Sequence, residues 1–201
     1  ENRFSLMTAK AEFCRLSHPL IISQMKSYKT EAPAFSLVLR HPWLMISTFF
    51  GSGCITPAPG TWGSFAAWLA FWLMQSAFGR APIWFASALA FILGCIAVGR
   101  SETYLHKTDH GSIVIDEVVA VWLTLLVTPI GFFWQFASVI AFRFFDIVKL
   151  PPVSVLDSMR QNGFTVMLDD VFAAVYAIIL INAAAYVLEV SGFAAPIWTF
   201  F

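Results

Sequence analysis

Five acidic residues lie within or beside apolar segments of the chain, where a carboxylate needs a compensating partner. They are Asp116, Glu117, Asp146, Asp169 and Asp170. A charge at the centre of a bilayer costs roughly 2.5–3.5 kcal/mol, and intramembrane acids are functional by default. Converging carboxylates also repel one another, and a divalent cation that prefers oxygen ligands removes both problems. The acids therefore predict a Mg²⁺ site with Asp116, Glu117, Asp169 and Asp170 as its ligands.

The same acids also have a structural interpretation, which the sequence leaves open. Each acid could cap a helix or pair with a nearby base. Arg143, Asp146 and Lys149 recur at three-residue spacing, so they share one helix face. That face could form an intrahelical salt bridge beside a lysine whose amine extends toward water. It could equally bind phosphate, because Arg offers a planar bidentate fork and Lys a point charge.

A glycine- and proline-rich stretch, GSGCITPAPGTWGS at residues 51–64, precedes the first long apolar segment. Its glycines permit close backbone approach, and Thr61 and Ser64 are candidate helix caps. A loop of exposed N–H groups that leads into a helix N-terminus binds anions readily. We therefore expect Gly60, Thr61 and Ser64 to contact a phosphate group. The alternative is a tight re-entrant turn that binds no ligand.

His110 lies in the sequence TDHGS, six residues before Asp116. A lone histidine in a loop is usually solvated or structural. Next to a metal site, however, an imidazole can transfer protons or hold the groups that surround the metal ligands. The sequence makes His110 a candidate catalytic residue together with the five acids.

The composition indicates where this chemistry takes place. The chain of 201 residues is 59% hydrophobic and only 12% charged, with a mean hydropathy of +0.75. Soluble domains are roughly 45–50% apolar and about 25% charged. A soluble fold of this size cannot bury so much apolar surface, so lipid must cover part of it. The zero net charge argues against nucleic acid as a partner.

Apolar segments of spanning or nearly spanning length position these residues. A membrane helix needs about 20 mostly apolar residues. The candidate segments are residues 64–78, 82–98, 113–128, 132–148 and 167–190. They predict an all-α integral membrane protein, a compact bundle of about four to five transmembrane helices with a re-entrant or interfacial Gly/Pro-rich loop. Residues 1–40 are expected to be an N-terminal cytoplasmic arm, residues 41–190 a transmembrane catalytic domain, and residues 191–201 a short C-terminal tail.

The basic residues predict the orientation of the bundle. All 12 Lys and Arg residues except Arg80 fall on the same side of the alternating segments. Because positive charge accumulates in cytoplasmic loops, the N-terminus is expected in the cytoplasm and the C-terminus outside. This orientation also predicts that the glycine-rich loop and all five acids gather at the cytoplasmic ends of the helices.

Together these stretches resemble the phosphatidylglycerophosphatase A family. The similar segments are TPAPGTWGS, DHGSIVIDEVV, FRFFDIVK and GFTVMLDDVFAAVYA, in that order, within residues 41–180. The resemblance implies a small protein of the bacterial inner membrane. It also implies a Mg²⁺-dependent reaction that converts phosphatidylglycerophosphate to phosphatidylglycerol and inorganic phosphate.

The residues and the resemblance agree on a mechanism. The acids would hold Mg²⁺, which polarises the phosphoryl oxygens, while Arg143, Lys149 and the backbone at Gly60 and Thr61 hold the phosphate in line. Direct attack by water is favoured over an aspartyl-phosphate, for which Asp146 or a paired acid could be the nucleophile. The main alternative is a cation- or proton-coupled transport protein, although transport places charges near the midplane rather than on one side. The sequence leaves the oligomeric state open.

Overall fold

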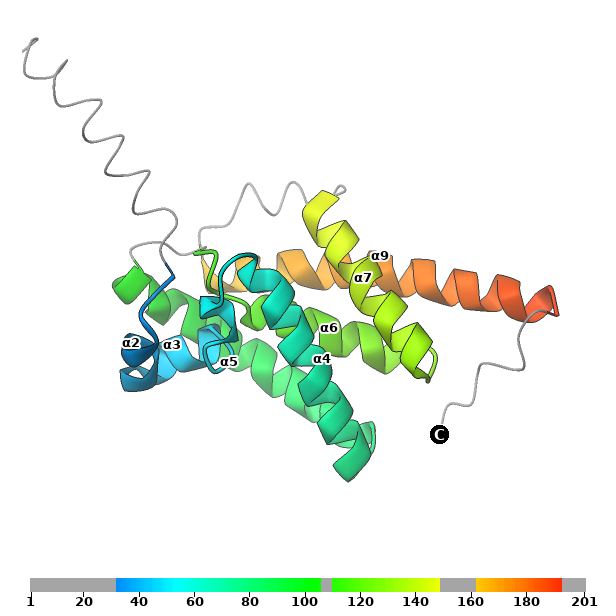
Figure 1. Ribbon diagram of the computed structural model, residues 1–201, viewed down its shortest axis with the longest axis horizontal. Coiled ribbons are helices and arrows are strands. Elements are labelled where there is room, and N and C mark those ends of the chain that lie inside the picture. The colour runs from blue at the N-terminus through cyan, green and yellow to red at the C-terminus, as the bar shows by residue number, and fades with distance from the viewer. Residues whose placement is uncertain (1–31, 106–109, 149–161, 193–201) are drawn as a thin grey trace, which may run out of the picture. The chain divides into compact units, whose positions relative to one another are not determined.

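The structure is a computed structural model that describes residues 32–105, 110–148 and 162–192. All regular structure in these ranges is helical, with no strand, which confirms the predicted all-α class. Figure 1 shows the order of the elements along the chain. They are α2 (Phe35–Arg40), α3 (Pro42–Ser47), the 3₁₀ helix η1 (Ser52–Cys54), α4 (Pro59–Phe78), α5 (Ala81–Leu105), α6 (Ile115–Val127), α7 (Phe132–Val148) and α9 (Gly163–Val190).

Each of the five predicted apolar segments corresponds to one long helix, but several boundaries differ. Helix α4 begins at Pro59, five residues before the predicted start. Proline suits the first helical position, because its fixed φ is helical and its missing N–H has no partner there in any case. Helix α9 begins at Gly163, where Asn162 forms a capping box with Thr165. The proline of α4 and the cap of α9, rather than hydropathy, therefore mark where these two helices begin.

Two of these helices are long and apolar enough to cross a membrane: α5, with 25 residues, and α9, with 28. Helix α6 has only 13 residues and extends about 20 Å, less than the roughly 30 Å of a hydrocarbon core. The count of four to five membrane spans and the re-entrant loop therefore stay predictions.

Helix α6 is apolar because the other helices surround it. Ten of its 13 residues are buried, and it packs against α4, α5, α7 and α9. A helix that is hydrophobic on all sides belongs in the interior of a protein. Its neighbours in the core include Phe71 of α4, Phe142 of α7 and Met167 of α9. The surrounding helices instead expose large apolar side chains, among them Trp72, Phe85, Phe132, Phe133 and Ile179.

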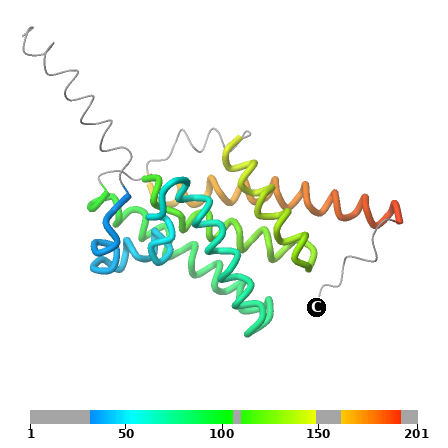
Figure 2. The backbone as a smooth tube through the Cα atoms, in the orientation of Figure 1, coloured from blue at the N-terminus to red at the C-terminus, as the bar shows by residue number. Residues whose placement is uncertain are grey.

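Successive long helices run in opposite directions, so the start of one helix lies near the end of another (Figure 2). The N-terminal turns of α4 and α6 meet the C-terminal half of α7 through Ser64, Glu117 and Arg143. The first residue of α9, Gly163, lies against the carbonyl of Cys95 in the second half of α5. The fold therefore brings together residues of α4, α6 and α7 that are distant in sequence.

Some of the predicted features lie outside the described residues. These are Lys149, most of the proposed N-terminal arm and most of the C-terminal tail.

Candidate functional site

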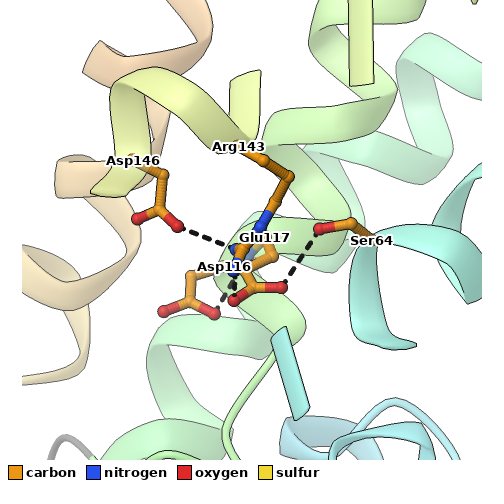
Figure 3. Close-up of polar contacts among 5 residues, drawn as sticks. All are labelled: Ser64, Asp116, Glu117, Arg143 and Asp146. Carbon is orange, nitrogen blue, oxygen red and sulfur yellow. Dashed lines mark hydrogen bonds and ion pairs between the residues drawn. The ribbon is translucent and has the colours of Figure 1, made fainter. Parts of the chain in front are cut away.

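Glu117 is the centre of a polar cluster that joins three helices (Figure 3). Its Oε1 lies 2.8 Å from Nη1 of Arg143 on α7. Its Oε2 accepts a hydrogen bond of 3.2 Å from Oγ of Ser64 on α4. The α6 backbone places Glu117 in the first helical turn, where the N-terminal dipole also stabilises a negative charge. One carboxylate therefore links α4, α6 and α7.

Arg143 lies between two acids. Its Nη1 donates to Oδ2 of Asp146 at 2.7 Å, one helical turn further along α7, and the same nitrogen pairs with Glu117. The intrahelical pair that three-residue spacing suggested is thus present. Neither pair uses Nη2 or Nε of Arg143. The side chains of Arg143, Glu117 and Asp146 are 21%, 13% and 16% exposed, so the cluster lies at the edge of the protein interior.

Gly60 lies beneath this ion pair. A Cβ at residue 60 would overlap Oε1 of Glu117 and lie 2.8 Å from Nη2 and 3.0 Å from Nη1 of Arg143. A side chain at residue 60 would therefore move the carboxylate and the guanidinium from these positions. The predicted close backbone approach therefore occurs, but toward a side-chain pair within the protein.

The predicted capping roles of Thr61 and Ser64 are wrong. Both residues lie inside α4, whose N-cap is Ala58 with no side-chain cap bond. The early start at Pro59 is the physical reason, because it places residues 60–64 in the first turns of the helix. Ser64 is buried and donates to Glu117, whereas Thr61 is exposed. Contact of Gly60, Thr61 and Ser64 with phosphate stays a prediction.

Three aspartates are more deeply buried than this cluster. Asp116 is 5% exposed, Asp169 is fully buried and Asp170 is 2% exposed. Asp116 accepts a hydrogen bond of 3.0 Å at Oδ1 from the N–H of Glu117. Asp170 interacts electrostatically with Arg143, which relates α9 to the cluster on α6 and α7. Buried carboxylates need compensating partners, so this end of the bundle holds a concentration of negative charge that the fold must balance.

The donor chemistry of these aspartates suits Mg²⁺, although the described residues contain no group of three or more His, Cys, Asp and Glu side chains arranged to hold a metal. Mg²⁺ requires no such cage. It prefers oxygen ligands, keeps several waters, and is commonly bound by one or two carboxylates together with substrate phosphate. The expected ligands Asp116, Glu117, Asp169 and Asp170 stay a prediction.

His110 is 9% exposed and stabilises the turn before α6. Its Nδ1 accepts a hydrogen bond of 3.2 Å from the N–H of Ser112, and its carbonyl accepts one from Ile113. These contacts fit the structural interpretation of this histidine. A catalytic role for His110 stays a prediction.

Two residues that hold the helices of the site, Asn162 and Arg80, are not among the residues predicted from the sequence. Asn162 caps α9 through Oδ1, which accepts from the N–H of Thr165 at 3.0 Å. The spacing of Asn162 and Thr165 was a readable signal for this cap. Arg80 donates to the carbonyls of Leu125 and Thr128 at the end of α6. No periodicity or motif predicts that contact, because it joins distant parts of the chain.

The sequence matches known proteins over the region that contains this site. Residues 45–185 match the family model described as Phosphatidylglycerophosphatase A. A Phosphatidylglycerophosphatase A of Haemophilus influenzae is 40% identical over 155 residues, which cover 77% of this chain and 95% of the relative. One of Escherichia coli is 36% identical over 149 residues, covering 69% of this chain and 81% of the relative.

A third relative, from Bacteroides thetaiotaomicron, bears the provisional description phosphatidylinositol-3-phosphatase. It is 36% identical over 154 residues, which cover 72% of this chain and 94% of the relative. No solved structure matches the chain. The family match spans well over half of the chain and includes every described residue of the polar cluster. The chain belongs to the phosphatidylglycerophosphatase A family.

Proposed function

We propose that this protein hydrolyses phosphatidylglycerophosphate to phosphatidylglycerol and inorganic phosphate, with Mg²⁺, at the cytoplasmic face of the bacterial inner membrane. Family membership makes the chain a phosphatase. The observation that carries the proposal is the extent of the match. Residues 45–185 enclose the Arg143–Glu117 pair, Asp146 and the buried aspartates of α6 and α9.

Arg143 would bind the phosphate group of the substrate. Its two ion pairs occupy Nη1, so the N–H groups of Nη2 and Nε can bind two phosphoryl oxygens. The bond between phosphorus and the bridging oxygen breaks as a water oxygen bonds to phosphorus, and the leaving oxygen takes a proton from a solvent water. Oδ1 of Asp146, which the pair with Arg143 does not use, would accept a proton from the attacking water.

One or two carboxylates from among Asp116, Asp169 and Asp170 would hold the magnesium ion, together with water and the substrate phosphate. Bound there, Mg²⁺ would neutralise phosphoryl charge and favour a nucleophilic water. All three carboxylates are buried at the N-terminal ends of α6 and α9, where water competes poorly for the ion. Asp170 also interacts with Arg143, so the cation and the guanidinium would act on the same phosphate.

A lipid substrate suits the surface around the site. Helices α4 and α7, which contribute Ser64 and Arg143, expose Phe65, Phe136 and Phe144. Apolar side chains of this size are compatible with acyl chains, while the polar cluster provides contacts for a phosphomonoester. The excess of basic residues on one side of the segments supports a cytoplasmic location.

Phosphate release by the purified protein tests the proposal. The full chain in detergent micelles should release phosphate from phosphatidylglycerophosphate with Mg²⁺, lose activity with EDTA and recover it when Mg²⁺ is restored. Asp116→Asn and Asp170→Asn should each reduce kcat/KM by at least about 100-fold, as expected when a metal ligand is lost. Glu102→Gln removes an exposed carboxylate of α5 and serves as the control.

Three outcomes would count against the proposal. Full activity in both Asp variants would refute the metal assignment. Hydrolysis of phosphatidylinositol 3-phosphate in preference to phosphatidylglycerophosphate would refute the substrate. Cation flux in vesicles without hydrolysis would favour the transport alternative.

A further inference from the structure

We infer that Glu117 is a positioning residue for Arg143 rather than a metal ligand, and that Gly60 and Ser64 of α4 set its orientation. This inference rests on the proposed function, in which Arg143 binds the phosphoryl group. It assigns three residues of the cluster to a single task, the orientation of one guanidinium.

Both oxygens of Glu117 already have partners within the protein. Oε1 lies 2.8 Å from Nη1 of Arg143, and Oε2 accepts from Oγ of Ser64 at 3.2 Å. Figure 3 shows the carboxylate of Glu117 between these two side chains. A metal ligand in the same position would direct an oxygen toward the cation and its other ligands. The contacts of Glu117 are instead to a base and a hydroxyl group.

Gly60 is the reason that this arrangement fits. A Cβ there would overlap Oε1 of Glu117 and lie within 3.0 Å of both terminal nitrogens of Arg143. The backbone of α4 therefore forms one wall of the site. It limits where the carboxylate and the guanidinium can lie.

Two carboxylates hold the guanidinium through a single nitrogen. Glu117 approaches Nη1 from α6, and Asp146 approaches it from the next turn of α7. The two contacts at Nη1 restrict the rotation of the guanidinium, and neither of them involves Nη2 or Nε. Arginine loses considerable side-chain freedom when it binds a ligand, and fixing it beforehand lowers that cost. Removal of Glu117 should therefore impair substrate binding and alignment and leave the affinity for Mg²⁺ unchanged.

The first test separates the two roles of Glu117 through the response to Mg²⁺. In Glu117→Gln, KM for phosphatidylglycerophosphate should rise about 10- to 100-fold, the scale of a misaligned binding group. The Mg²⁺ concentration for half-maximal activity should stay within about twofold of wild type, whereas Asp170→Asn should raise it strongly. Because turnover could obscure binding, the rise in melting temperature that Mg²⁺ produces in detergent is measured in parallel. Glu117→Gln should retain this rise.

The second test changes Gly60, whose backbone forms one wall of the site. Gly60→Ala keeps every charge but should raise KM in the same way as Glu117→Gln. Gly99→Ala is the matched control, since Gly99 is also a helical glycine and a Cβ there meets no atom within 4 Å. Ser64→Ala should weaken substrate binding in the wild-type background and have no further effect when Glu117 is already Gln, because the two side chains act in series.

The outcomes distinguish this inference from the proposed function. If Glu117→Gln abolishes the Mg²⁺-induced rise in melting temperature, or raises the Mg²⁺ requirement as Asp170→Asn does, then Glu117 is a metal ligand and the inference is wrong while the phosphatase function stands. Additive effects of Ser64→Ala and Glu117→Gln would also overturn it. If the wild-type protein releases no phosphate, the proposed function itself fails.

Discussion

Gly163, the first residue of α9, lies directly against the carbonyl oxygen of Cys95 on α5, with no space for a Cβ between them. The contact fixes the position at which α9 begins. Asp169 and Asp170 follow within the next two turns of the same helix. The placement of two buried acids therefore depends on a glycine that has no polar chemistry of its own.

Gly163→Ala should destabilise the protein and reduce its activity. The added methyl group must displace backbone rather than a flexible side chain, and such overpacking typically costs about 1–3 kcal/mol. Thermal unfolding in detergent, followed by size-exclusion chromatography, measures the loss of stability. Gly99→Ala should unfold at or slightly above the wild-type temperature, since its Cβ lies in open space and alanine favours the helix. Equal melting temperatures for the two variants would contradict the close contact at Gly163.

Asn162→Ala should loosen the start of α9. The substitution removes the oxygen that accepts from the N–H of Thr165, and the loss of such a cap costs about 0.5–2 kcal/mol. Hydrogen exchange should become faster for the amides of the first turn of α9. Asn162→Asp keeps the accepting oxygen and should preserve the wild-type rate. Unchanged exchange in Asn162→Ala would show that packing alone holds this helix end.

Arg80→Ala should lower stability without changing the kinetic constants of the folded enzyme. Arg80 donates to the carbonyls of Leu125 at 3.2 Å and Thr128 at 3.5 Å, at the opposite end of α6 from Glu117. Loss of hydrogen bonds from a charged donor costs about 1.5–3 kcal/mol. KM and kcat measured on the folded fraction should equal those of wild type. A large change in KM would indicate that the two ends of α6 are coupled.

Gln135→Leu should weaken the contact between α4 and α7. Oε1 of Gln135 accepts from Nε1 of Trp68 at 2.9 Å, and its Nε2 donates to Oε1 of Gln75 at 3.3 Å. A typical hydrogen bond within a protein contributes about 0.5–1.5 kcal/mol, so the loss in unfolding free energy should be modest. Comparison with Trp68→Phe and the double variant tests the pairing. Additive losses would show that Trp68 and Gln135 do not interact.

The long helices could largely be predicted, because a long apolar segment is typical of a helix whose surface is covered by protein or lipid. Hydropathy does not distinguish an apolar helix that other helices surround from one that lipid surrounds. The sequence predicts a membrane span over residues 113–128; α6 lies in this segment, and ten of its 13 residues are buried within the protein. The helix starts at Pro59 and Gly163 do not follow from hydropathy, because a proline at the first helical position marks α4 and the capping box of Asn162 with Thr165 marks α9.

The site was predictable only where spacing within one helix determines a contact. Arg143 and Asp146 are three residues apart, so their pair followed from helical geometry. The contact of Arg143 with Glu117, and that of Glu117 with Ser64, joins residues from different helices. Those partners depend on how α4, α6 and α7 cross, which no sequence period encodes. The acids were therefore recognised as a group, while their individual partners were not.

The close fit at Gly60 has a consequence for the way such proteins can diverge. A Cβ at residue 60 would take the space that Oε1 of Glu117 now occupies, so a larger residue at position 60 displaces that carboxylate. An alanine at position 60 would be tolerated best beside an aspartate at 117, whose carboxylate is one methylene closer to its own backbone. Positions 60 and 117 should accordingly change together among related phosphatases, and a glutamate beside an alanine should be the rarest of the four combinations.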